Sequence, residues 1–220
     1  MIQADEINFE PLKLKGPYLS KVMIKDNMIF QLRNLHLFQN GSELASLRLE
    51  YYTVYGLFFE SPPEKIKHLI DIEENVETLN EEYLNLFIRP NTKYVFPCGS
   101  AYKKPKEKRR NIINFLINNK KDNQRPDDHV LIGLNYMRFL IEREKRQWQK
   151  KNSLMAIDLL QQQQEYLLSH LNWLPDLCAE IQKKTTCQFY HDAALNLENF
   201  FQLEKLLLEI VLLKNTSTMN

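Results

Sequence analysis

The scarcity of glycine constrains the fold of this chain more than any other feature of its sequence. Only five glycines occur among 220 residues, so glycine-rich turns, β-sandwiches and phosphate-binding loops have few positions at which to form. Apolar residues instead recur at spacings of three and four in several segments, which is the period of an amphipathic helix. The hydrophobic content of 44% is enough to fill a core. The sequence therefore predicts an all-α fold, a single-domain bundle of about eight to ten helices.

Charge and cysteine content exclude several classes of protein. The formal net charge of +1 provides no general positive field for nucleic acid. The three cysteines, Cys98, Cys178 and Cys187, are too few and too irregularly spaced for a disulfide framework, which indicates a reducing compartment. The apolar run 206–213 is interrupted by Glu209 and is too short to cross a bilayer, and the first residues lack a secretory signal pattern. We expect a soluble, cytoplasmic protein.

The most informative segment is RPDDHVLIGLNYMRFLI, residues 125–141. Proline followed by two aspartates, Asp127 and Asp128, is typical of a helix start, because short carboxylates accept hydrogen bonds from unpaired N–H groups there. One face of the helix behind them should be buried, since its apolar residues recur at helical spacing: Val130, Leu134, Met137 and Ile141. Asp128 and His129 would lie at the rim of this helix start. The pair is either a plain cap beside a partly buried histidine or the polar end of a binding groove.

The chain before this segment divides into an extension and two helical regions. Residues 1–41 follow neither helical nor strand periodicity and form an N-terminal extension of uncertain structure, ahead of a helical domain at 42–220. Ser42 is expected to cap a helix that stops before Pro62 and Pro63. A second helical region should run from about residue 64 to residue 89. Its glutamates at 73–82 form either a solvated helix face or an acidic surface for a basic peptide.

Residues 103–125 form a polar connector and include the most basic part of the chain. The run KKPKEKRRNIINFLINNKK interleaves lysine and arginine with Phe and Ile, a composition that can contact RNA. We favour a mobile hinge around a short helix. The alternative, an α-helical RNA- or DNA-binding or regulatory protein using residues 103–121, remains open at this point.

Two motifs resemble the TorD/DmsD/NarJ-like family of maturation chaperones for molybdenum-containing redox enzymes. The first motif of that family has an acidic residue and an aromatic, then Leu-Phe, a proline, and a loop of the type Pro-Tyr-Glu-Ser-x-Tyr. The residues here that match it are Glu82, Tyr83, Leu86, Phe87, Pro90, Pro97, Ser100 and Tyr102. The second reads Pro-Asp-Asp-His-Leu-Gly-x-Glu-Leu-x-Phe-Met. Its matches are Pro126, Asp127, Asp128, His129, Leu134, Tyr136 and Met137.

A late corner and three departures complete the comparison. Residues 170–175, His-Leu-Asn-Trp-Leu-Pro, resemble the family's corner His-Leu-x-x-Trp-Leu-Pro with one residue fewer before the tryptophan, and the resemblance covers roughly residues 47–214. The loop tyrosine and glutamate of the family are replaced here by Cys98 and Gly99, and the glutamate one turn after the histidine is replaced by Gly133.

The resemblance implies a TorD-like helical chaperone that binds the N-terminal region of a molybdopterin-dependent oxidoreductase. That region is often a twin-arginine signal peptide, and binding assists cofactor loading and assembly before export. The residues expected to bind the peptide are Glu82, Tyr83, Leu86, Phe87, Ser100, Tyr102, Asp127, Asp128, His129 and Tyr136. Some members exchange halves across the connector, so we expect a monomer with a possible domain-swapped dimer.

No catalytic or cofactor site is predicted from the residues. His170, Cys178, Cys187 and His191 lie within one stretch of the sequence, but their gaps match no common zinc-site spacing. His191-Asp192 resembles the metal-binding pair of HD-type phosphohydrolases, yet too little chain follows for the distant aspartate ligand. No Walker loop, dinucleotide fingerprint or nucleophile elbow occurs. We therefore expect a protein that is not an enzyme, with no metal, no cofactor, no nucleic acid and no membrane among its partners.

Overall fold

The computed structural model describes residues 41–60, 62, 75–103 and 126–217, with side chains placed as far as residue 212. These residues form seven α-helices, one π-helical turn and no β-strand. The elements are α2 (Gly41–Glu60), α4 (Val76–Tyr83), η2 (Leu84–Ile88), α5 (Ser100–Lys103), α7 (Val130–Gln149), α8 (Ser153–His170), α9 (Leu174–Lys184) and α10 (Gln188–Ser217). The expected all-α fold is confirmed. No described helix combines the length and the apolar character needed to cross a bilayer.

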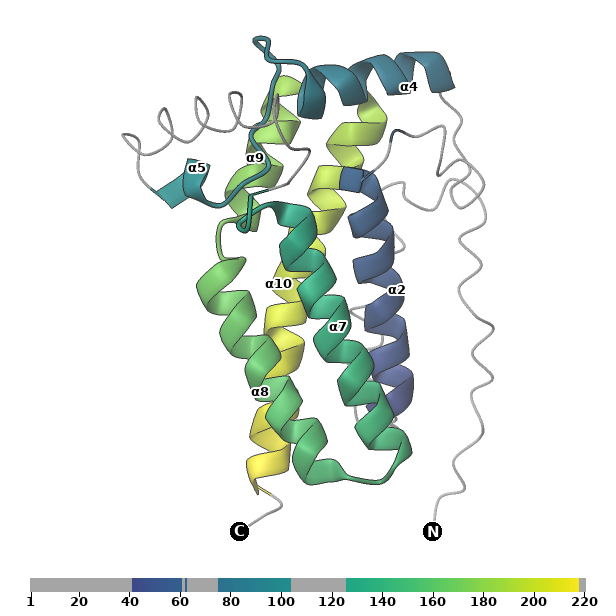
Figure 1. The fold of residues 1–220 in the computed structure, drawn as a ribbon, viewed down its shortest axis with the longest axis vertical. Helices are drawn as coiled ribbons and strands as arrows, with labels where there is room; N and C mark the ends of the chain where they lie inside the picture. The colour runs from purple at the N-terminus through teal and green to yellow at the C-terminus, as the bar shows by residue number, and fades with distance from the viewer. Residues whose placement is uncertain (1–40, 61, 63–74, 104–125, 218–220) are drawn as a thin grey trace.

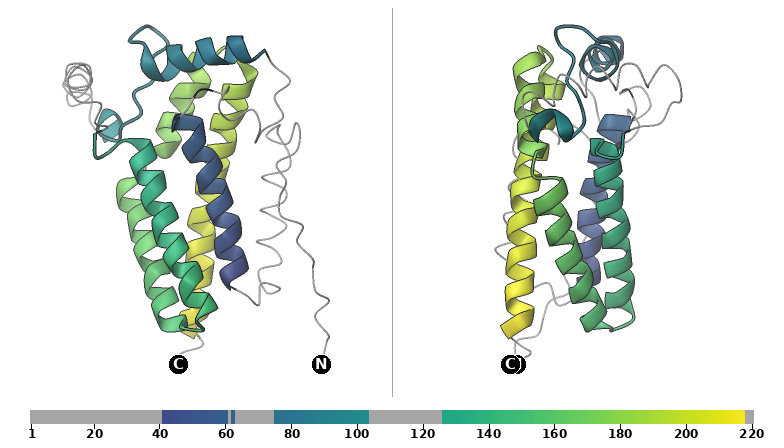
Figure 2. Two further views of the ribbon diagram at one scale, coloured as in Figure 1. Left: turned by 45° about the vertical axis from the view of Figure 1, so that its right-hand side comes forward. Right: turned by 60° about the vertical axis from the view of Figure 1, so that its left-hand side comes forward.

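Four long helices form the body of the molecule. Helices α2, α7, α8 and α10 run side by side, with α7 between α2 and α8 on the face toward the viewer and α10 behind them (Figure 1). The two turned views show the same bundle, with α4 lying across one end of it (Figure 2). Helices α7 and α8 form a hairpin joined by a short turn, in which Lys151 has a positive φ of 58°. The end of the bundle under α4 is also where α5, α9 and the first turn of α7 meet.

Aromatic side chains fill much of the core. The ring of Phe200 on α10 lies 5.3, 5.0 and 5.3 Å from the rings of Tyr51, Tyr52 and Tyr55 on α2. Such offset and edge-to-face pairs each add roughly 0.5–1.5 kcal/mol to the burial of the rings. These contacts join the first and the last described helices of the bundle.

A charged cluster is buried at the centre of the four long helices. Arg48 on α2 donates to Glu204 on α10 at 2.7 Å and to Glu144 on α7 at 2.8 Å, and all three side chains are at most 1% exposed. Gln163 on α8 donates to Glu144 at 3.0 Å and accepts a hydrogen bond from Arg48. From the charges of residues 142–151 alone, we would expect this end of α7 to be exposed, and that expectation is wrong for Glu144. Its carboxylate is buried because a guanidinium meets it there.

The helix boundaries agree with the sequence in several places and differ in others. Asn152 followed by Ser153 is a typical start of a helix, and Asn152 does cap α8, its side chain accepting from the N–H of Met155 at 3.3 Å. Ser42 lies inside the first turn of α2, because that helix already begins at Gly41. Residues 1–40, 61, 63–74 and 104–125 lie outside the described residues. They include the N-terminal extension and most of the basic segment of the nucleic-acid alternative.

Candidate functional site

The two sequence motifs are hydrogen-bonded to each other in the folded chain. The N–H of Gly99 donates to the carbonyl of Asp128 at 3.0 Å, and the N–H of Val130 donates to the carbonyl of Pro97 at 2.8 Å. Cys98 and His129 form an isolated antiparallel bridge between these bonds. We call residues 97–100 together with residues 126–130 the motif junction. It lies where α5 and α7 begin.

Asp128 does not cap the helix that follows it. The N-cap of α7 is His129, whose Nδ1 accepts from the N–H of Leu131 at 3.1 Å. The carboxylate of Asp128 instead accepts from the N–H of Ser100 at 2.7 Å, at the first residue of α5. The expected cap is therefore corrected by one residue, because the aspartate is used across the motif junction. Burial raises the pKa of the Cys98 thiol beside it, and the charge of Asp128 raises that pKa further.

Tyr102 fixes the short α5 helix to α9. Its ring stacks on Trp173 with centroids 5.5 Å apart and planes 7° from parallel. Its hydroxyl donates to Glu180 on α9 at 2.8 Å and lies 3.1 Å from the carbonyl of Phe96. Burial raises the pKa of this phenol, and the Glu180 carboxylate raises it further. Tyr102 is therefore a neutral hydrogen-bond donor over the ordinary pH range.

Two of the departures from the family motifs are glycines that pack against the late corner. A Cβ at residue 99 would lie 2.5 Å from Nε1 of Trp173, and a Cβ at residue 133 would lie 2.5 Å from Cδ2 of Leu171. Leu171 and Trp173 are 1% and 4% exposed, so neither can swing into solvent without leaving the core. The glutamates of the family motif cannot occupy these two positions in this packing.

Glu82 is buried on α4 and holds three elements together. Its carboxylate accepts from Lys93 Nζ at 3.0 Å, from Thr185 Oγ1 at 2.8 Å and from the N–H of Thr186 at 3.2 Å. Burial alone would raise the pKa of this carboxyl, but the hydrogen bonds and the charge of Lys93 outweigh it, and the pKa is lowered. The carboxylate therefore stays ionised and joins α4 to the loop before Tyr94 and to the turn between α9 and α10.

The next three predicted site residues belong to the core around the π-helical turn. Tyr83, Leu86 and Phe87 are 5%, 0% and 6% exposed. The Arg89 N–H donates to the carbonyl of Leu84 at 2.7 Å, five residues back, and so closes the wide turn. The ring of Phe87 lies 5.5 Å from those of Tyr83 and Phe59. These three side chains therefore belong to the hydrophobic core of the protein.

Tyr136 and Asp127 are the two predicted site residues that are exposed at the surface. Tyr136 is 41% exposed on α7 and its ring lies 4.5 Å from that of Tyr166 on α8. Asp127 is exposed and directly precedes Asp128, the residue that links the starts of α5 and α7. Ser100, Tyr102 and Asp128 are half-buried and His129 is 7% exposed. The motif junction thus contains four of the ten predicted residues, Ser100, Asp127, Asp128 and His129, and Tyr102 follows it closely in α5.

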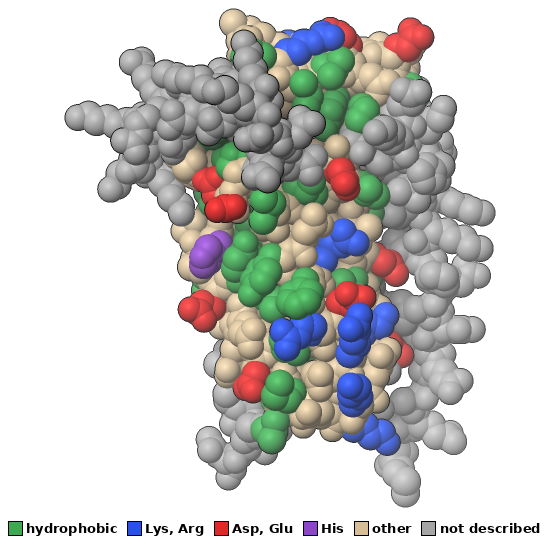
Figure 3. All heavy atoms as spheres, in the orientation of Figure 1, with side chains coloured by type: hydrophobic (Ala, Val, Ile, Leu, Met, Phe, Trp, Pro, Cys, Tyr) green, Lys and Arg blue, Asp and Glu red, His purple; other side chains and the backbone are tan. Residues whose placement is uncertain are grey.

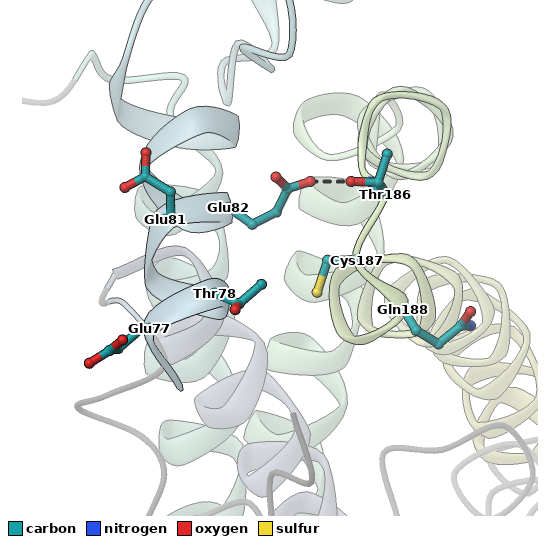
Figure 4. A pocket seen from close by; sticks show the side chains of 7 residues that line it. All are labelled: Glu77, Thr78, Glu81, Glu82, Thr186, Cys187 and Gln188. Carbon is teal, nitrogen blue, oxygen red and sulfur yellow. Dashed lines mark hydrogen bonds between the residues drawn. The ribbon is translucent and has the colours of Figure 1, made fainter. Parts of the chain in front are cut away.

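An acidic groove opens between α4 and the turn that joins α9 to α10. It has a volume of about 630 Å³ and is lined by Glu77, Thr78, Glu81, Glu82, Thr186, Cys187 and Gln188. Figure 4 shows Glu82 pointing from α4 toward Thr186, with Cys187 on the opposite wall, whereas Glu77 and Glu81 extend from the side of α4 that faces away from that wall. Glu81 is also ion-paired with Arg89, and both side chains are about half exposed. The groove presents negative charge to solvent at a place where a cation could approach.

Thr186, Cys187 and Gln188 were not predicted, and no periodic pattern in the sequence could have indicated them. They lie in the turn before α10 and at its first residue, more than one hundred residues after Glu82, and only the fold brings them to α4. Lys93, which pairs with Glu82, is not part of either sequence motif. The acidic run was visible in the sequence, but the opposite wall was not.

The fold and the site define an all-helical protein with an acidic groove and a hydrogen-bonded motif junction, an arrangement suited to binding another chain. A family model, the nitrate reductase delta subunit, matches residues 59–179, which is more than half of the chain. The chain belongs to this family of non-catalytic maturation chaperones for molybdoenzymes, of the TorD/DmsD/NarJ type. The resemblance read from the two motifs is thereby confirmed. No curated protein and no solved structure matches the chain significantly.

Proposed function

We propose that this chaperone binds the N-terminal segment of a molybdopterin-dependent oxidoreductase catalytic subunit in the cytoplasm. Binding would assist cofactor loading and assembly, and would delay export where that segment is a twin-arginine signal peptide. Membership of the nitrate reductase delta subunit family supports the client class. The acidic groove is the single structural observation that carries the proposal further.

The chemistry of the groove fits a basic peptide. A twin-arginine segment brings positive charge ahead of an apolar stretch, so its receptor needs carboxylates next to an apolar surface. Glu77 and Glu81 stand at the solvent edge of the groove, whereas Glu82 is engaged by Lys93, Thr185 and Thr186. We therefore assign contact with the client's arginines to Glu77 and Glu81, and a positioning role to Glu82.

The remaining predicted residues divide by their exposure. Five of them are exposed or half-buried, so a peptide could contact them: Ser100, Tyr102, Asp127, Asp128 and Tyr136. In this proposal they extend the binding site from the groove toward α7. Tyr83, Leu86, Phe87 and His129 are buried and would act by holding the walls in place.

Calorimetry with the full chain and a synthetic N-terminal peptide of a molybdoenzyme from the same host tests the proposal. The double variant Glu77→Gln, Glu81→Gln removes two exposed carboxylates without changing their shape. It should weaken binding roughly tenfold or more, since hydrogen bonds to charged groups contribute about 1.5–3 kcal/mol each. Binding by the unaltered chain should also weaken as salt is raised.

A matched control separates the groove from general electrostatics. Glu142 and Glu165 are exposed on α7 and α8, away from the groove. The double variant Glu142→Gln, Glu165→Gln changes the net charge by the same amount and should leave affinity unchanged. Equal weakening in both double variants would show that the peptide does not bind in the groove. A chain that binds none of its host's molybdoenzyme N-terminal peptides would overturn the function itself.

A further inference from the structure

Arg89 binds one of the two carboxylates that the proposed function assigns to the client's arginines. Its Nη1 donates to Oε1 of Glu81 on α4, and the two side chains are 49% and 56% exposed. Glu81 lines the acidic groove together with Glu77, which lies one helical turn earlier. Figure 3 shows basic and acidic side chains next to one another at the end of the molecule where α4 lies. A client arginine that reaches Glu81 therefore meets a guanidinium that is already bound there.

The π-helical turn places Arg89 where it can reach Glu81. In an uninterrupted α-helix, residue 89 would lie about 80° around the axis from residue 81. The wide turn η2 contains an extra residue, which sets the residues after it back by about 100°. Arg89 directly follows η2 and is thereby returned to the side of α4 that carries Glu81. The ion pair thus depends on an irregular turn of a kind that is frequent at functional sites.

The backbone of Arg89 is held in place, and its side chain is joined to Glu81 at the surface. The N–H of Arg89 closes the π-helical turn at 2.7 Å, and Pro90 follows it. Beyond the proline, the side chain of Asn91 donates to Oδ1 of Asn85 at 3.0 Å and so ties the chain back to η2. An exposed ion pair contributes little free energy. The guanidinium can therefore leave Glu81 at a small free-energy cost, without movement of the backbone.

We propose that Arg89 is a built-in competitor for the client's arginine at Glu81. In the free chaperone the Arg89 guanidinium occupies the Glu81 carboxylate, and the client's arginine binds there by displacing it. The inference rests on the proposed function, because it concerns the same groove. Exchange of one guanidinium for another leaves the number of ion pairs at Glu81 unchanged, so the client gains less free energy there than at a carboxylate without a partner. Arg89 thereby lowers the affinity of the chaperone for its client.

Calorimetry with the full chain and the same N-terminal peptide tests this inference. Arg89→Gln frees Glu81 and should tighten binding about two- to fivefold, the range that corresponds to loss of one exposed ion pair. Arg146→Gln is the matched control. Arg146 is also exposed and is paired with Glu142 at 3.2 Å, but this pair lies on α7, away from the groove. The control changes the net charge by the same amount and should leave the affinity unchanged.

A second background separates displacement from a general effect of charge. In a chain that carries Glu81→Gln, the further change Arg89→Gln should bring no gain in affinity, because no carboxylate is left to be freed. A peptide whose arginines are replaced by glutamine should bind Arg89→Gln and the unaltered chain equally. A gain that persists in the Glu81→Gln background, or equal gains from Arg89→Gln and Arg146→Gln, overturns the inference.

Failure of this inference differs from failure of the proposed function. If Glu77→Gln, Glu81→Gln weakens binding while Arg89→Gln leaves it unchanged, the peptide binds in the groove and Arg89 is not a competitor. If neither the unaltered chain nor Arg89→Gln binds the peptide, the proposed function and the inference are both overturned.

Discussion

The indole of Trp173 packs so closely on the backbone of Gly99 that a Cβ at residue 99 would lie 2.5 Å from its Nε1. The ring cannot move aside, because Nε1 donates to the carbonyl of His170 at 2.7 Å and the ring is stacked on Tyr102. We predict that Gly99→Ala lowers the free energy of unfolding by about 1–3 kcal/mol, the usual effect of overpacking. Urea-induced unfolding measures it.

Gly56→Ala provides the matched control for that substitution. Gly56 lies inside α2, where a Cβ would meet Leu131 Cδ1 at 3.7 Å, an ordinary contact. Alanine in a helix interior is favoured over glycine by roughly 0.5–1 kcal/mol. Gly56→Ala should therefore stabilise the chain. If both variants lost stability equally, the close approach of Trp173 would not be the cause.

Asp128 has a structural role that two substitutions can separate from peptide binding. Asp128→Asn keeps an oxygen that can accept from the N–H of Ser100, so stability should change little. Asp128→Ala leaves that N–H without its acceptor and should cost about 1–3 kcal/mol of unfolding free energy. Thermal melts of the two variants compare these effects.

Asp128→Asn also tests whether Asp128 contacts the client peptide. If an arginine of the peptide also reaches Asp128, Asp128→Asn removes a charge-assisted hydrogen bond and should weaken binding roughly ten- to a hundredfold. Unchanged affinity for Asp128→Asn would make Asp128 a purely structural residue of the motif junction, and the arginine contacts would rest on Glu77 and Glu81.

Glu82 should make stability depend on pH. Its pKa is lowered in the folded chain, so its contribution is present above the ordinary carboxyl pKa and is lost as pH falls through the folded value. Glu82→Gln cannot accept as strongly from Lys93 and Thr185 and should cost about 1–2 kcal/mol at pH 7. Once the pH has fallen through the folded pKa of Glu82, the difference from the unaltered chain should shrink toward zero. A difference that stayed constant as the pH was lowered would exclude the charge as its origin.

A buried hydroxyl offers a stabilising substitution. The hydroxyl of Tyr55 is buried and has no hydrogen-bond partner in the part of the chain that the structure describes. Tyr55→Phe removes the unpaired group and should raise the free energy of unfolding by up to about 1 kcal/mol. Tyr190→Phe is the comparison. The Tyr190 hydroxyl lies 3.1 Å from the carbonyl of Leu79, so its removal should lower the free energy of unfolding. Calorimetric melts rank the two, and the opposite order would contradict the assignment.

The sequence predicted the helices well and the contacts between distant helices poorly. Apolar periodicity located α7 and α8 because a buried helix face repeats every three to four residues, and that signal is local. Nothing local in the sequence indicates that Glu144 and Glu204 are buried, because only the fold places Arg48 between them. The prediction failed where a polar residue is buried by a partner far away in the sequence.

The candidate site divides in the same way. The two motifs indicated which residues meet at the motif junction, yet not that Asp128 would serve α5 while His129 capped α7. A capping pattern fixes the helix end only to within a residue or two when neighbouring polar side chains compete. The acidic wall of the groove was visible as a run of glutamates, but the wall at Cys187 depends on a turn that no pattern marks.

The buried cluster around Arg48 also bears on how the chain is made. Arg48 lies in the first described helix and Glu204 in the last. The ribosome therefore synthesises the arginine 156 residues before the carboxylate that it binds. Until α10 emerges, the nascent bundle would hold a charged group that it cannot bury without a large free-energy cost. Closure of the four helices is therefore tied to the synthesis of α10 rather than to that of α2. A chaperone built in this way can offer its finished surface to a client only after its own translation has run to α10.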